Sequence, residues 1–592
     1  MCGIIAYIGS KNPSRVVIAG LKKLEYRGYD SWGVACFSEN DVSIYKEVGK
    51  VGEYENTHVF ENCTMALGQT RWATHGGVTL ENAHPHVSQD RSIVIVQNGI
   101  VENYFALKEK LEKEGYVFRT ETDTEVIANL LHFHRKKHSL FHAGRRAFDE
   151  IIGRNAIVFG ERGGAELIAM RKGSPLILGI AEDGDFFIAS DIPAFLEYTR
   201  KINYLDDGEM AVVRIGNPHE LTVFSIASGN PIQKRLIEIE WNMDEAKKGK
   251  YKYFIIKEIM EQKETLRRVI NQDEADFYDV VQAIKNAYGT FAVACGTAGY
   301  ASMIGTYFFS EIAHKHINFT VASEFSNYVD FLTPETLMLV TTQSGETADV
   351  LEAMEAGTER GVKIVSLVNV VGSTVDRKSD KTLYLKAGPE QAVCSTKATT
   401  AHIALFLLLA YGVADKLAVG KRFLVDVASN VNDMLNPRYE EVIIRLAHQL
   451  KDSRDIYVIG RGISYPLALE IAHKIKEVSY IHAEGMAGGE LKHGTLSLIE
   501  TGTPVIVLTA EDKNKAAILS NAMEIKARGG YIIGIACEPH PLYDYFIKVP
   551  NIGFGFPVVS LIPGQMLAYH LAVLRGLNPD KPRNLAKSVT VK

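Results

Sequence analysis

The sequence predicts a multidomain chain of mixed α/β and α+β class, in which a strand-rich N-terminal third precedes two copies of an αβα unit. Short apolar strands separated by turn residues run from Met1 to about Glu240. Beyond Lys252, strands alternate with helices, which is typical of parallel sheets. At 592 residues the chain is too long for one core, and about three or four domains are expected. We therefore expect domains at 1–240, 253–435 and 436–582, a linker at 241–252 and a tail at 583–592.

The composition excludes some classes of partner and compartment. The formal charge of −6 argues against a nucleic acid bound by general electrostatics. The longest apolar run, Ile403 to Ala414, is too short to span a bilayer and predicts a buried helix, and no signal segment begins the chain. Six scattered cysteines without a C-x-x-C pair argue against a disulfide framework or a thiolate zinc site, and favour a reducing cytosol; they are Cys2, Cys36, Cys63, Cys295, Cys394 and Cys537. We expect a cytoplasmic protein without a membrane partner.

The first candidate nucleophile is Cys2. Removal of Met1 would leave Cys2 as the mature N-terminus, with an α-amine of pKa near ~8 close enough to accept the thiol proton. The apolar run Ile4 to Ile8 predicts a short buried strand that holds this terminus in place. Taken alone, the dipeptide favours a loose end with an incidental cysteine. The strand and the motifs that follow favour the nucleophile.

A second candidate element is Asn98-Gly99, which directly follows the predicted buried strand 92–97. An Asn-Gly pair after a strand commonly forms a hairpin corner, and by itself this pair favours that interpretation. The alternative is functional, because the Asn98 amide and the Gly99 N–H would both suit a developing oxyanion.

The segment Arg71 to Gly76 and Asp123 suggest an amino-acid site. The planar fork of Arg71 suits a carboxylate, and Thr74 and His75 add polar partners. Asp123 stands at a predicted helix start, where capping is its commonest role, but it would also suit an ammonium group. A capping arginine at a strand end is the structural alternative for Arg71. Together with Cys2, these groups match an α-amino acid with a reactive side-chain amide, which is glutamine.

These motifs resemble the N-terminal-nucleophile glutaminase domain of the class II amidotransferases, and among these the glucosamine-6-phosphate synthase family. The resemblance covers about 125 residues and rests on the segments Cys2-Gly3-Ile4, Tyr26 to Ser31, Arg71 to Gly76, Asn98-Gly99 and Asp123. It implies an αββα sandwich in which Cys2 attacks the glutamine carboxamide. It further implies that Asn98 and Gly99 line the oxyanion hole, that Arg71 and Asp123 hold the amino-acid end, and that Trp72 helps to gate ammonia passage.

A histidine-rich stretch follows. His132, His134, His138 and His142 lie within eleven residues, and the last three would share one face of a continuous helix. Because lysine and arginine residues are interleaved and no carboxylate supports them, the stretch predicts a solvated helix face and no metal site.

The C-terminal part contains an internal repeat with an offset of about 165 residues. Phe291 to Tyr300 parallels Ile456 to Ile463, each a strand, a glycine turn and a helix start. Thr336 to Val340 likewise parallels Thr503 to Val507. Ligands of such parallel sheets bind beyond the strand C-terminal ends, at the glycine turns.

The two copies differ where a phosphate would bind. In the first, Thr341 to Thr347 is a hydroxyl- and glycine-rich loop that opens a helix, whose N–H groups suit a phosphate. The equivalent stretch in the second copy, Thr509 to Asp512, is acidic. Ser395-Thr396-Lys397 supplies a second polar helix start in the first copy. One such loop alone favours an N-cap, but two together predict one phosphate site per chain, in the first copy.

This pair resembles the two sugar-isomerase domains of the glucosamine-6-phosphate synthase family, over about Lys252 to Lys592. The resemblance implies that fructose 6-phosphate binds at Thr297, Thr342, Gln343, Ser344, Thr347, Val393 and Ser395. Ala298 departs from the serine usual in the family, which removes one hydroxyl from the site. Cys394 replaces a small residue and is a milder change.

The second copy predicts an acid–base group. Glu470, Lys474 and Glu477 share one helical face by their spacing, and by itself this pattern is typical of a salt-bridged surface stripe. The resemblance implies instead that Glu477 moves a proton between C1 and C2 of the open-chain sugar, with Lys474 tuning it. It also implies that His493 assists ring opening in a neighbouring subunit, and that Lys587 condenses with the ketose carbonyl. A shared histidine predicts a homodimer.

The sequence therefore predicts a glutamine-dependent amidotransferase that converts fructose 6-phosphate and glutamine to glucosamine 6-phosphate and glutamate, with ammonia passed internally. Its small-molecule substrates are glutamine and fructose 6-phosphate; no cofactor, metal or nucleic acid is expected. Two alternatives stay open: the same architecture acting on another keto-sugar phosphate, and a non-catalytic regulator that binds a sugar phosphate.

Overall fold

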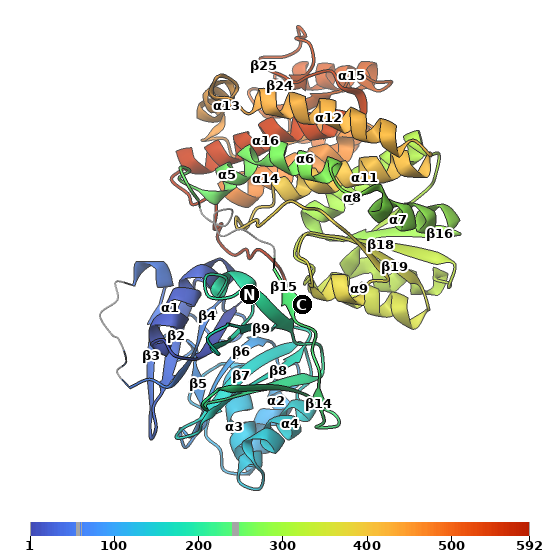
Figure 1. Cartoon of the computed structure of the whole chain (residues 1–592). Coiled ribbons are helices and arrows are strands. Elements are labelled where there is room, and N and C mark those ends of the chain that lie inside the picture. The colour runs from blue at the N-terminus through green and yellow to red at the C-terminus, as the bar shows by residue number, and fades with distance from the viewer. Residues whose placement is uncertain (1, 55–59, 61, 240–247, 591–592) are drawn as a thin grey trace. The chain divides into compact units, whose positions relative to one another are not determined.

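The computed structural model describes residues 2–54, 60, 62–239 and 248–590. The chain forms two compact units, one of Met1–Asp244 with Ala586–Lys592 and the other of Glu245–Leu585 (Figure 1). The predicted linker 241–252 falls largely on residues outside the described range, and the predicted domain boundaries stay predictions.

The first unit contains two antiparallel sheets with helices on their outer faces (Figure 1). The eight-stranded sheet has the order β15-β11-β9-β10-β1-β4-β2-β3, and the seven-stranded sheet the order β14-β13-β12-β8-β7-β6-β5. The strands are β1 (Gly3–Ile8), β2 (Ser31–Phe37), β3 (Val42–Val48), β4 (Met65–Arg71), β5 (His86–Val87), β6 (Ile93–Gly99), β7 (Asn155–Glu161), β8 (Glu166–Lys172), β9 (Ile177–Ile180), β10 (Phe186–Ala189), β11 (Lys201–Tyr204), β12 (Glu209–Arg214), β13 (Glu220–Ser225), β14 (Pro231–Ile232) and β15 (Ile237–Glu238). The helices are α1 (Pro13–Leu24), α2 (Tyr104–Lys113), α3 (Asp123–Arg135) and α4 (Leu140–Glu150).

Side-chain alternation along the strands explains these layers. In β1, Ile4 and Ala6 pack in the apolar layer that also contains Val94 and Val96 of β6, whereas Ile5 and Tyr7 pack with residues of α1. Because successive side chains point to opposite faces of a strand, one face of each sheet meets the other sheet and the opposite face meets helices. This arrangement confirms the predicted αββα sandwich.

The second unit contains two five-stranded parallel sheets of the same topology. Their orders are β17-β16-β18-β19-β20 and β22-β21-β23-β24-β25, so each copy places its first strand second in the sheet. The strands are β16 (Gly289–Ala294), β17 (Asn318–Val321), β18 (Thr336–Thr342), β19 (Lys363–Val368), β20 (Lys381–Tyr384), β21 (Asp455–Gly460), β22 (His482–Ala487), β23 (Pro504–Thr509), β24 (Tyr531–Ala536) and β25 (Tyr545–Lys548). The predicted repeat of two parallel-sheet αβα units is confirmed.

Helices cover these sheets and form the shared core. They are α5 (Phe254–Met260), α6 (Gln262–Ile270), α7 (Glu274–Asn286), α8 (Gly296–Ile312), α9 (Ala348–Glu359), α10 (Thr374–Lys378), α11 (Lys397–Val413), α12 (Leu417–Met434), α13 (Pro437–Leu450), α14 (Ser464–Ser479), α15 (Lys515–Lys526) and α16 (Phe556–Leu574). The predicted buried helix at Ile403 to Ala414 is most of α11. Within the described residues one helical stretch, Gly553–Leu574, has the length and apolarity of a membrane span, but 83% of its apolar window is buried, so it is a core helix.

The histidine stretch does not form one helical face. Helix α3 ends at Arg135 and α4 begins at Leu140, so His138 lies in the connection between them. His134 contacts Glu150 at 2.8 Å, and His132 lies 3.3 Å from Asp90. The predicted continuous face was wrong because the chain turns between the two helices.

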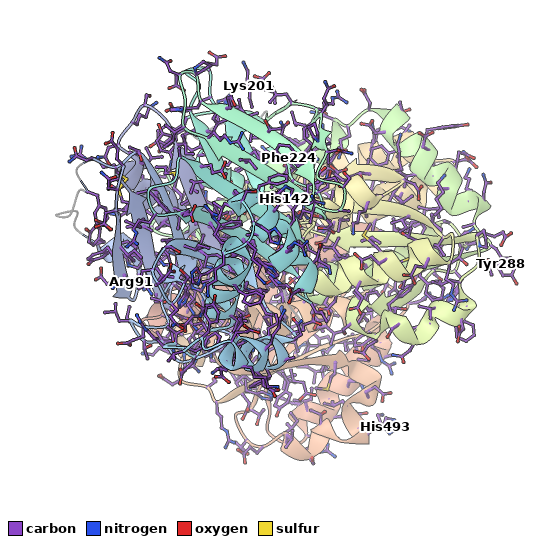
Figure 2. All side chains as sticks on the ribbon, turned by 90° about the horizontal axis from the view of Figure 1, so that it is seen from below. Arg91, His142, Lys201, Phe224, Tyr288 and His493 are labelled. Atoms are coloured by element: carbon purple, nitrogen blue, oxygen red, sulfur yellow. A yellow bond between two sulfur atoms is a disulfide. The ribbon has the colours of Figure 1, made fainter. Side chains whose placement is uncertain are left out.

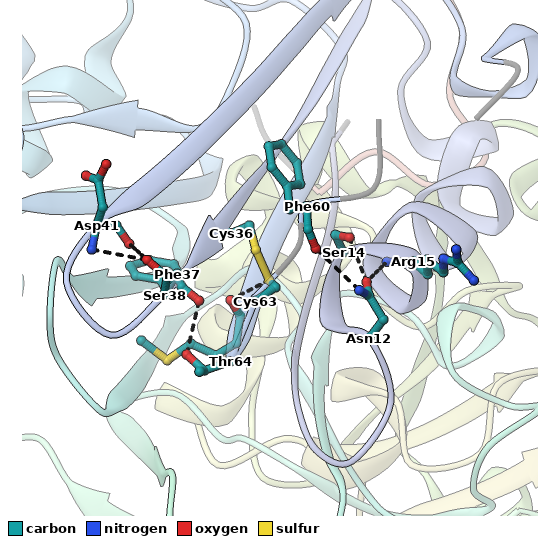
Figure 3. The surroundings of a disulfide bond; sticks show 11 residues. Asn12, Ser14, Arg15, Cys36, Phe37, Ser38, Asp41, Phe60, Cys63 and Thr64 are labelled. Atoms are coloured by element: carbon teal, nitrogen blue, oxygen red, sulfur yellow. Dashed lines mark hydrogen bonds between the residues drawn. A yellow bond between two sulfur atoms is a disulfide. The ribbon is translucent and has the colours of Figure 1, made fainter. Parts of the chain in front are cut away.

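Cys36 and Cys63 form a disulfide, although the scattered cysteines had argued against a disulfide framework (Figure 3). Cys36 lies on β2, and Cys63 lies two residues before β4, the neighbouring strand. The Thr64 N–H donates to the Phe37 carbonyl at 2.8 Å, and the two cysteine Cα atoms are 5.6 Å apart. This pairing depends on strand register, which cysteine spacing does not reveal.

Candidate active sites

Cys2 lies where β1 begins, beside the end of β4. Its Sγ atom is 3.4 Å from the backbone nitrogen of Trp72 and 3.6 Å from the Trp72 carbonyl oxygen. The Cys2 carbonyl accepts hydrogen bonds from Asn98 Nδ2 at 2.9 Å and from Arg27 Nε at 3.2 Å. Since β1 pairs with β4 and β10, the sheet fixes the residue that follows this cysteine. The loose N-terminal end that was the alternative is therefore wrong for Cys2; Met1 lies outside the described residues.

Asn98 and Gly99 do not form a hairpin corner. Both belong to β6, where they pair with Ala156 and Asn155 of β7. Gly99 has a φ of 143°, and a Cβ there would lie 2.0 Å from the Arg154 carbonyl oxygen, so only glycine fits. Gln69 Nε2 donates to Asn98 Oδ1 at 3.1 Å, which directs Asn98 Nδ2 toward Cys2. The hairpin interpretation is wrong, and the geometry suits the oxyanion alternative.

Arg71 is buried and holds the loop that follows it. Its guanidinium donates to the Gly77 carbonyl at 3.0 Å and the Gly76 carbonyl at 3.1 Å, and also to the His75 carbonyl. Burial lowers the pKa of Arg71, which nearby Cys2, Asp30 and Asp123 partly offset. The alternative of a capping arginine thus describes part of its contacts, because the carbonyls of residues 75–77 are its partners. Thr74 is exposed, and Trp72 is half-buried.

Asp123 is the first residue of α3 but does not cap it. Its Oδ2 accepts from the Val101 N–H at 2.8 Å, which lies in the segment after β6. The residue is 4% exposed, and burial raises the pKa of its carboxyl group, while Val101 and the neighbouring His75 act in the opposite direction. Asp123 is therefore near enough to His75 and Arg71 for their charges to influence one another. An ammonium group is a suitable partner for a buried carboxylate in this position.

Two residues of the Tyr26 to Ser31 motif support this site, although their roles were not predicted. Arg27 bonds the Cys2 carbonyl and forms an ion pair with Asp191 at 3.1 Å. Asp30 Oδ2 accepts from the Ala73 N–H at 2.9 Å, and the Asp30 N–H donates to the Arg71 carbonyl at 3.0 Å. The dense run of charged and aromatic residues marks this motif in the sequence. The hydrogen-bond and ion-pair partners of Arg27 and Asp30 could not be predicted, because they are distant in the chain.

The acid–base stripe of the second unit is buried. Lys474 Nζ lies 2.8 Å from Glu477 Oε2 and 3.7 Å from Glu470 Oε1. The side chains of Glu470, Lys474 and Glu477 are 0%, 1% and 10% exposed, so the surface-stripe interpretation is wrong. Burial raises the pKa of Glu470 to about 7. Burial alone would also raise the pKa of Glu477, but Lys474, His473 and Cys394 outweigh it and hold that pKa below its ordinary value.

The predicted phosphate loop joins β18 to α9. Thr342 Oγ1 accepts from the Gly345 N–H at 3.3 Å and lies 3.3 Å from Thr347 Oγ1. Ser344 Oγ accepts from the Glu346 N–H at 3.2 Å. Thr297 lies in the first turn of α8, which follows β16, and β16 pairs with β18. The C-terminal ends of these neighbouring strands therefore bring Thr297 and the loop to one edge of the sheet.

The second polar helix start differs from the prediction. Glu390 Oε1 accepts from the Thr396 N–H at 2.9 Å and the Ala398 N–H at 3.1 Å, and Glu390 Oε2 accepts from Ser395 Oγ at 3.0 Å. An internal carboxylate thus occupies the start of α11, where a phosphate was expected. Val393 is buried beside this turn, and its N–H donates to the Asp580 carbonyl. The predicted phosphate loop is then limited to residues 342–347.

The remaining predicted residues lie at the surface or in the tail. His493 is exposed at the edge of the second unit (Figure 2). Lys587 is half-buried in the segment Ala586–Lys592, which belongs to the first unit. Ala298 is half-buried in the first turn of α8, and its carbonyl accepts from Ser302 Oγ. Among the described residues, no three His, Cys, Asp or Glu side chains are grouped so as to hold a metal ion.

Models of two known domain families match separate parts of this chain. The model of the glutamine amidotransferase domain matches residues 74–197, and the SIS domain model matches residues 284–411 and 449–575. A solved C-terminal domain of glucosamine-fructose-6-phosphate aminotransferase from Francisella tularensis matches at 31% identity and a TM-score of 0.53, covering 56% of this chain and 99% of that one.

Full-length relatives extend the likeness to the whole chain. The glutamine–fructose-6-phosphate aminotransferase [isomerizing] of Thermococcus kodakarensis is 42% identical over 606 residues, with 100% of both chains covered. The protein of the same name from Pyrococcus horikoshii is 41% identical over 601 residues, again with 100% of both chains covered. The chain therefore belongs to the family of isomerizing glutamine–fructose-6-phosphate aminotransferases.

Proposed function

We propose that Cys2 and the α14 carboxylates carry the two halves of the family's reaction. As a member of this family, the chain converts fructose 6-phosphate and glutamine into glucosamine 6-phosphate and glutamate. The observation that carries the assignment of residues is a cysteine whose backbone carbonyl accepts from the oriented Asn98 amide in one unit, with a buried Glu–Lys–Glu stripe in the other.

In the first unit, Cys2 Sγ attacks the carboxamide carbon of glutamine. Asn98 Nδ2 and the Gly99 N–H stabilise the oxyanion that forms, and collapse of the adduct releases ammonia and leaves a thioester. Water then hydrolyses the thioester to glutamate. Asp123 pairs with the substrate ammonium group, Arg71 with its neighbours Thr74 and His75 receives the carboxylate, and Trp72 gates ammonia. The free α-amine of Cys2 takes the thiol proton and passes it to the departing nitrogen, which leaves as ammonia.

In the second unit, Thr297, Thr342, Gln343, Ser344 and Thr347 hold the sugar phosphate, with Val393 and Ser395 beside them. Ser395 acts on the sugar side and not on the phosphate, since Glu390 already occupies the adjacent helix start. Lys587 condenses with the ketose carbonyl with loss of water, the incoming ammonia displaces the lysine nitrogen from C2, and Glu477 moves a proton between C1 and C2. The ion pair with Lys474 keeps Glu477 ionised, as a general base requires.

Ammonia passes internally, because at neutral pH free ammonia becomes ammonium, which does not attack a carbonyl. His493 assists ring opening in the site of a second copy of the chain, so the working form is a homodimer. The exposure of His493 is compatible with such a contact. A cytoplasmic location and the absence of a metal or cofactor stay predictions.

The test uses glutamine labelled with ¹⁵N at its amide, together with fructose 6-phosphate and mass spectrometry of the products. The wild type should give labelled glucosamine 6-phosphate. Cys2→Ala should give none, while still isomerising fructose 6-phosphate in the absence of glutamine. Undiminished labelled aminosugar from Cys2→Ala would refute the role of Cys2.

A second substrate is worth testing because Ala298 lacks the hydroxyl group usual in the family. Turnover should be compared across several keto-sugar phosphates for the wild type and for Ala298→Ser. A preference of the wild type for another keto-sugar phosphate would favour the alternative substrate, whereas a preference for fructose 6-phosphate in both would exclude it.

A further inference from the structure

Asn82 is a buried amide that joins two separate segments of the candidate glutamine site. It is 3% exposed and lies between the Arg71 to Gly77 region and β5. Its Nδ2 donates to the Gly77 carbonyl at 3.1 Å and to Glu121 Oε2 at 2.9 Å. Its Oδ1 accepts from the Glu121 N–H at 3.0 Å. Both polar atoms of this side chain are therefore used to connect residue 77 with residue 121.

Glu121 completes the connection from the other side. Its Oε2 accepts from the Gly77 N–H at 3.0 Å as well as from Asn82 Nδ2. Both backbone groups of Gly77 are thereby held, the N–H by Glu121 and the carbonyl by Asn82 and Arg71. The hydrogen bonds from Gly77 and Asn82 lower the pKa of Glu121, in agreement with an ionised acceptor.

The backbone of the loop lies directly against these two side chains. Gly76 has a φ of 77°, and a Cβ at this position would lie 2.8 Å from the Cβ of Glu121 and 3.0 Å from Asn82 Nδ2. Both the left-handed conformation and the lack of space require glycine here. The contact is thus a close fit of the loop on Asn82 and Glu121.

The hydrogen bonds of Asn82 and Glu121 join two segments, and each segment carries groups that are proposed to bind one end of the substrate glutamine. Thr74 and His75 precede Gly77 in the loop that Arg71 holds, and Asp123 follows Glu121 by two residues at the start of α3. We propose that Asn82 and Glu121 are positioning residues for glutamine: they form a latch that sets the distance between the loop that receives the carboxylate and the Asp123 carboxylate that receives the ammonium group. This inference rests on the proposed function of the site.

The latch predicts a specific split between kinetic parameters. Asn82→Ala removes three hydrogen bonds but no group that touches the reacting carboxamide, so we expect the KM for glutamine to rise roughly tenfold to a hundredfold with kcat within about threefold. Glu121→Ala should raise the KM in the same direction. Because both act through one connection, the double variant should be no worse than about threefold beyond Asn82→Ala alone.

Glu121→Gln separates positioning from a direct charge effect on the substrate. The glutamine side chain keeps an oxygen that accepts from Gly77 and Asn82, so we expect a KM within about threefold of the wild type. Loss of binding in Glu121→Gln equal to that in Glu121→Ala would show that the charge itself is needed, and would overturn the latch.

The experiment measures glutamate release from glutamine by the full chain, together with isomerisation of fructose 6-phosphate and thermal unfolding. Glu81→Ala is the matched control, because Glu81 is an exposed acid in the same loop and should leave the KM unchanged. Isomerisation and the unfolding midpoint should stay at wild-type values in each latch variant. An unchanged KM in Asn82→Ala, or an equal fall of all three readouts, would overturn the inference. Absence of glutamate release by the wild type would instead overturn the proposed function.

Discussion

Replacing Lys474 by methionine tests the electrostatics of the second site most directly. Methionine keeps much of the aliphatic stem but removes the ammonium group that lies 2.8 Å from Glu477 Oε2 and 3.7 Å from Glu470 Oε1. Two carboxylates are then left in a site where the lysine was 1% exposed. Removing one partner of a buried ion pair costs about 3–5 kcal/mol, since the remaining charge is neither paired nor hydrated.

The cost should appear as a change in proton affinity. In the wild type the groups facing Glu477 are Lys474, His473 and Cys394, which together hold its pKa below the ordinary value against the effect of burial. Without Lys474, the effect of burial dominates, so the pKa of Glu477 rises. If the whole 3–5 kcal/mol is expressed in proton affinity, at 1.36 kcal/mol per pH unit, the acid limb of the rate profile moves up by about two to four pH units.

The assay is isomerisation of fructose 6-phosphate in the absence of glutamine, followed between pH 5 and pH 9. We expect kcat/KM of Lys474→Met at pH 6 to fall roughly threefold or more relative to its own value at pH 8, with a much flatter wild-type profile over the same range. Lys476→Met on the exposed side of the same helix is the matched control. A Lys474→Met profile that coincides with the wild-type profile would refute the assignment of Glu477 as a base kept ionised by Lys474.

Three further outcomes are expected. The pKa of Glu470 is raised to about 7 from its ordinary 4.5, so folding favours the protonated carboxyl group. The stability that this protonated form contributes is lost as the pH rises from 4.5 through about 7. Glu470→Gln should therefore gain thermal stability relative to the wild type from pH 5 to pH 8, by up to about 3 kcal/mol, and a pH-independent difference would contradict this. Asn98→Ala should lower kcat for glutamine hydrolysis by roughly 10²–10³, with isomerisation unaffected; a change confined to KM would argue against an oxyanion role. Gly564→Ala places a Cβ 2.7 Å from Ile471 Cγ1, where α16 packs on α14. It should destabilise the second unit by about 1–3 kcal/mol in thermal unfolding. An unchanged unfolding midpoint would show that the two helices move apart without a cost in stability.

The elements that could be predicted from the sequence are those set by local periodicity. The apolar run at Ile4 to Ile8 forms β1, and the spacing of Glu470, Lys474 and Glu477 does place them on one face of α14. Spacing along a helix does not reveal whether that face is covered. Its burial results from packing of α14 against α8 and α16, elements that are distant in the chain.

The features that were missed all depend on non-local partners. Asn98-Gly99 is a typical hairpin pair, but here β6 continues through both residues because β7 pairs with them. The start of α11 has the composition of an anion site, but Glu390 supplies the anion from within the chain. The Cys36–Cys63 bond likewise follows from the register of β2 and β4 and not from cysteine spacing.

The two copies of the internal repeat differ at the positions proposed for the acid–base groups, which bears on the proposal of one sugar site per chain. Helices α8 and α14 are equivalent, since each follows the first strand of its copy through a left-handed glycine, Gly296 with φ 51° and Gly462 with φ 56°. When the two copies are aligned on these glycines, the fully buried Ile304 and Phe308 of α8 stand at the sequence positions equivalent to Glu470 and Lys474 of α14.

The phosphate loop shows the opposite asymmetry. In the second copy, Asp512 Oδ1 accepts from the Asn514 N–H at 2.7 Å just before α15, so a carboxylate already satisfies this turn and repels an anion. Because α8 and α14 pack on each other, the acid–base stripe of one copy meets the hydroxyl-bearing helix start of the other. Apolar residues at positions 304 and 308 of α8 avoid a second buried Glu–Lys pair beside the first, which would add desolvation cost.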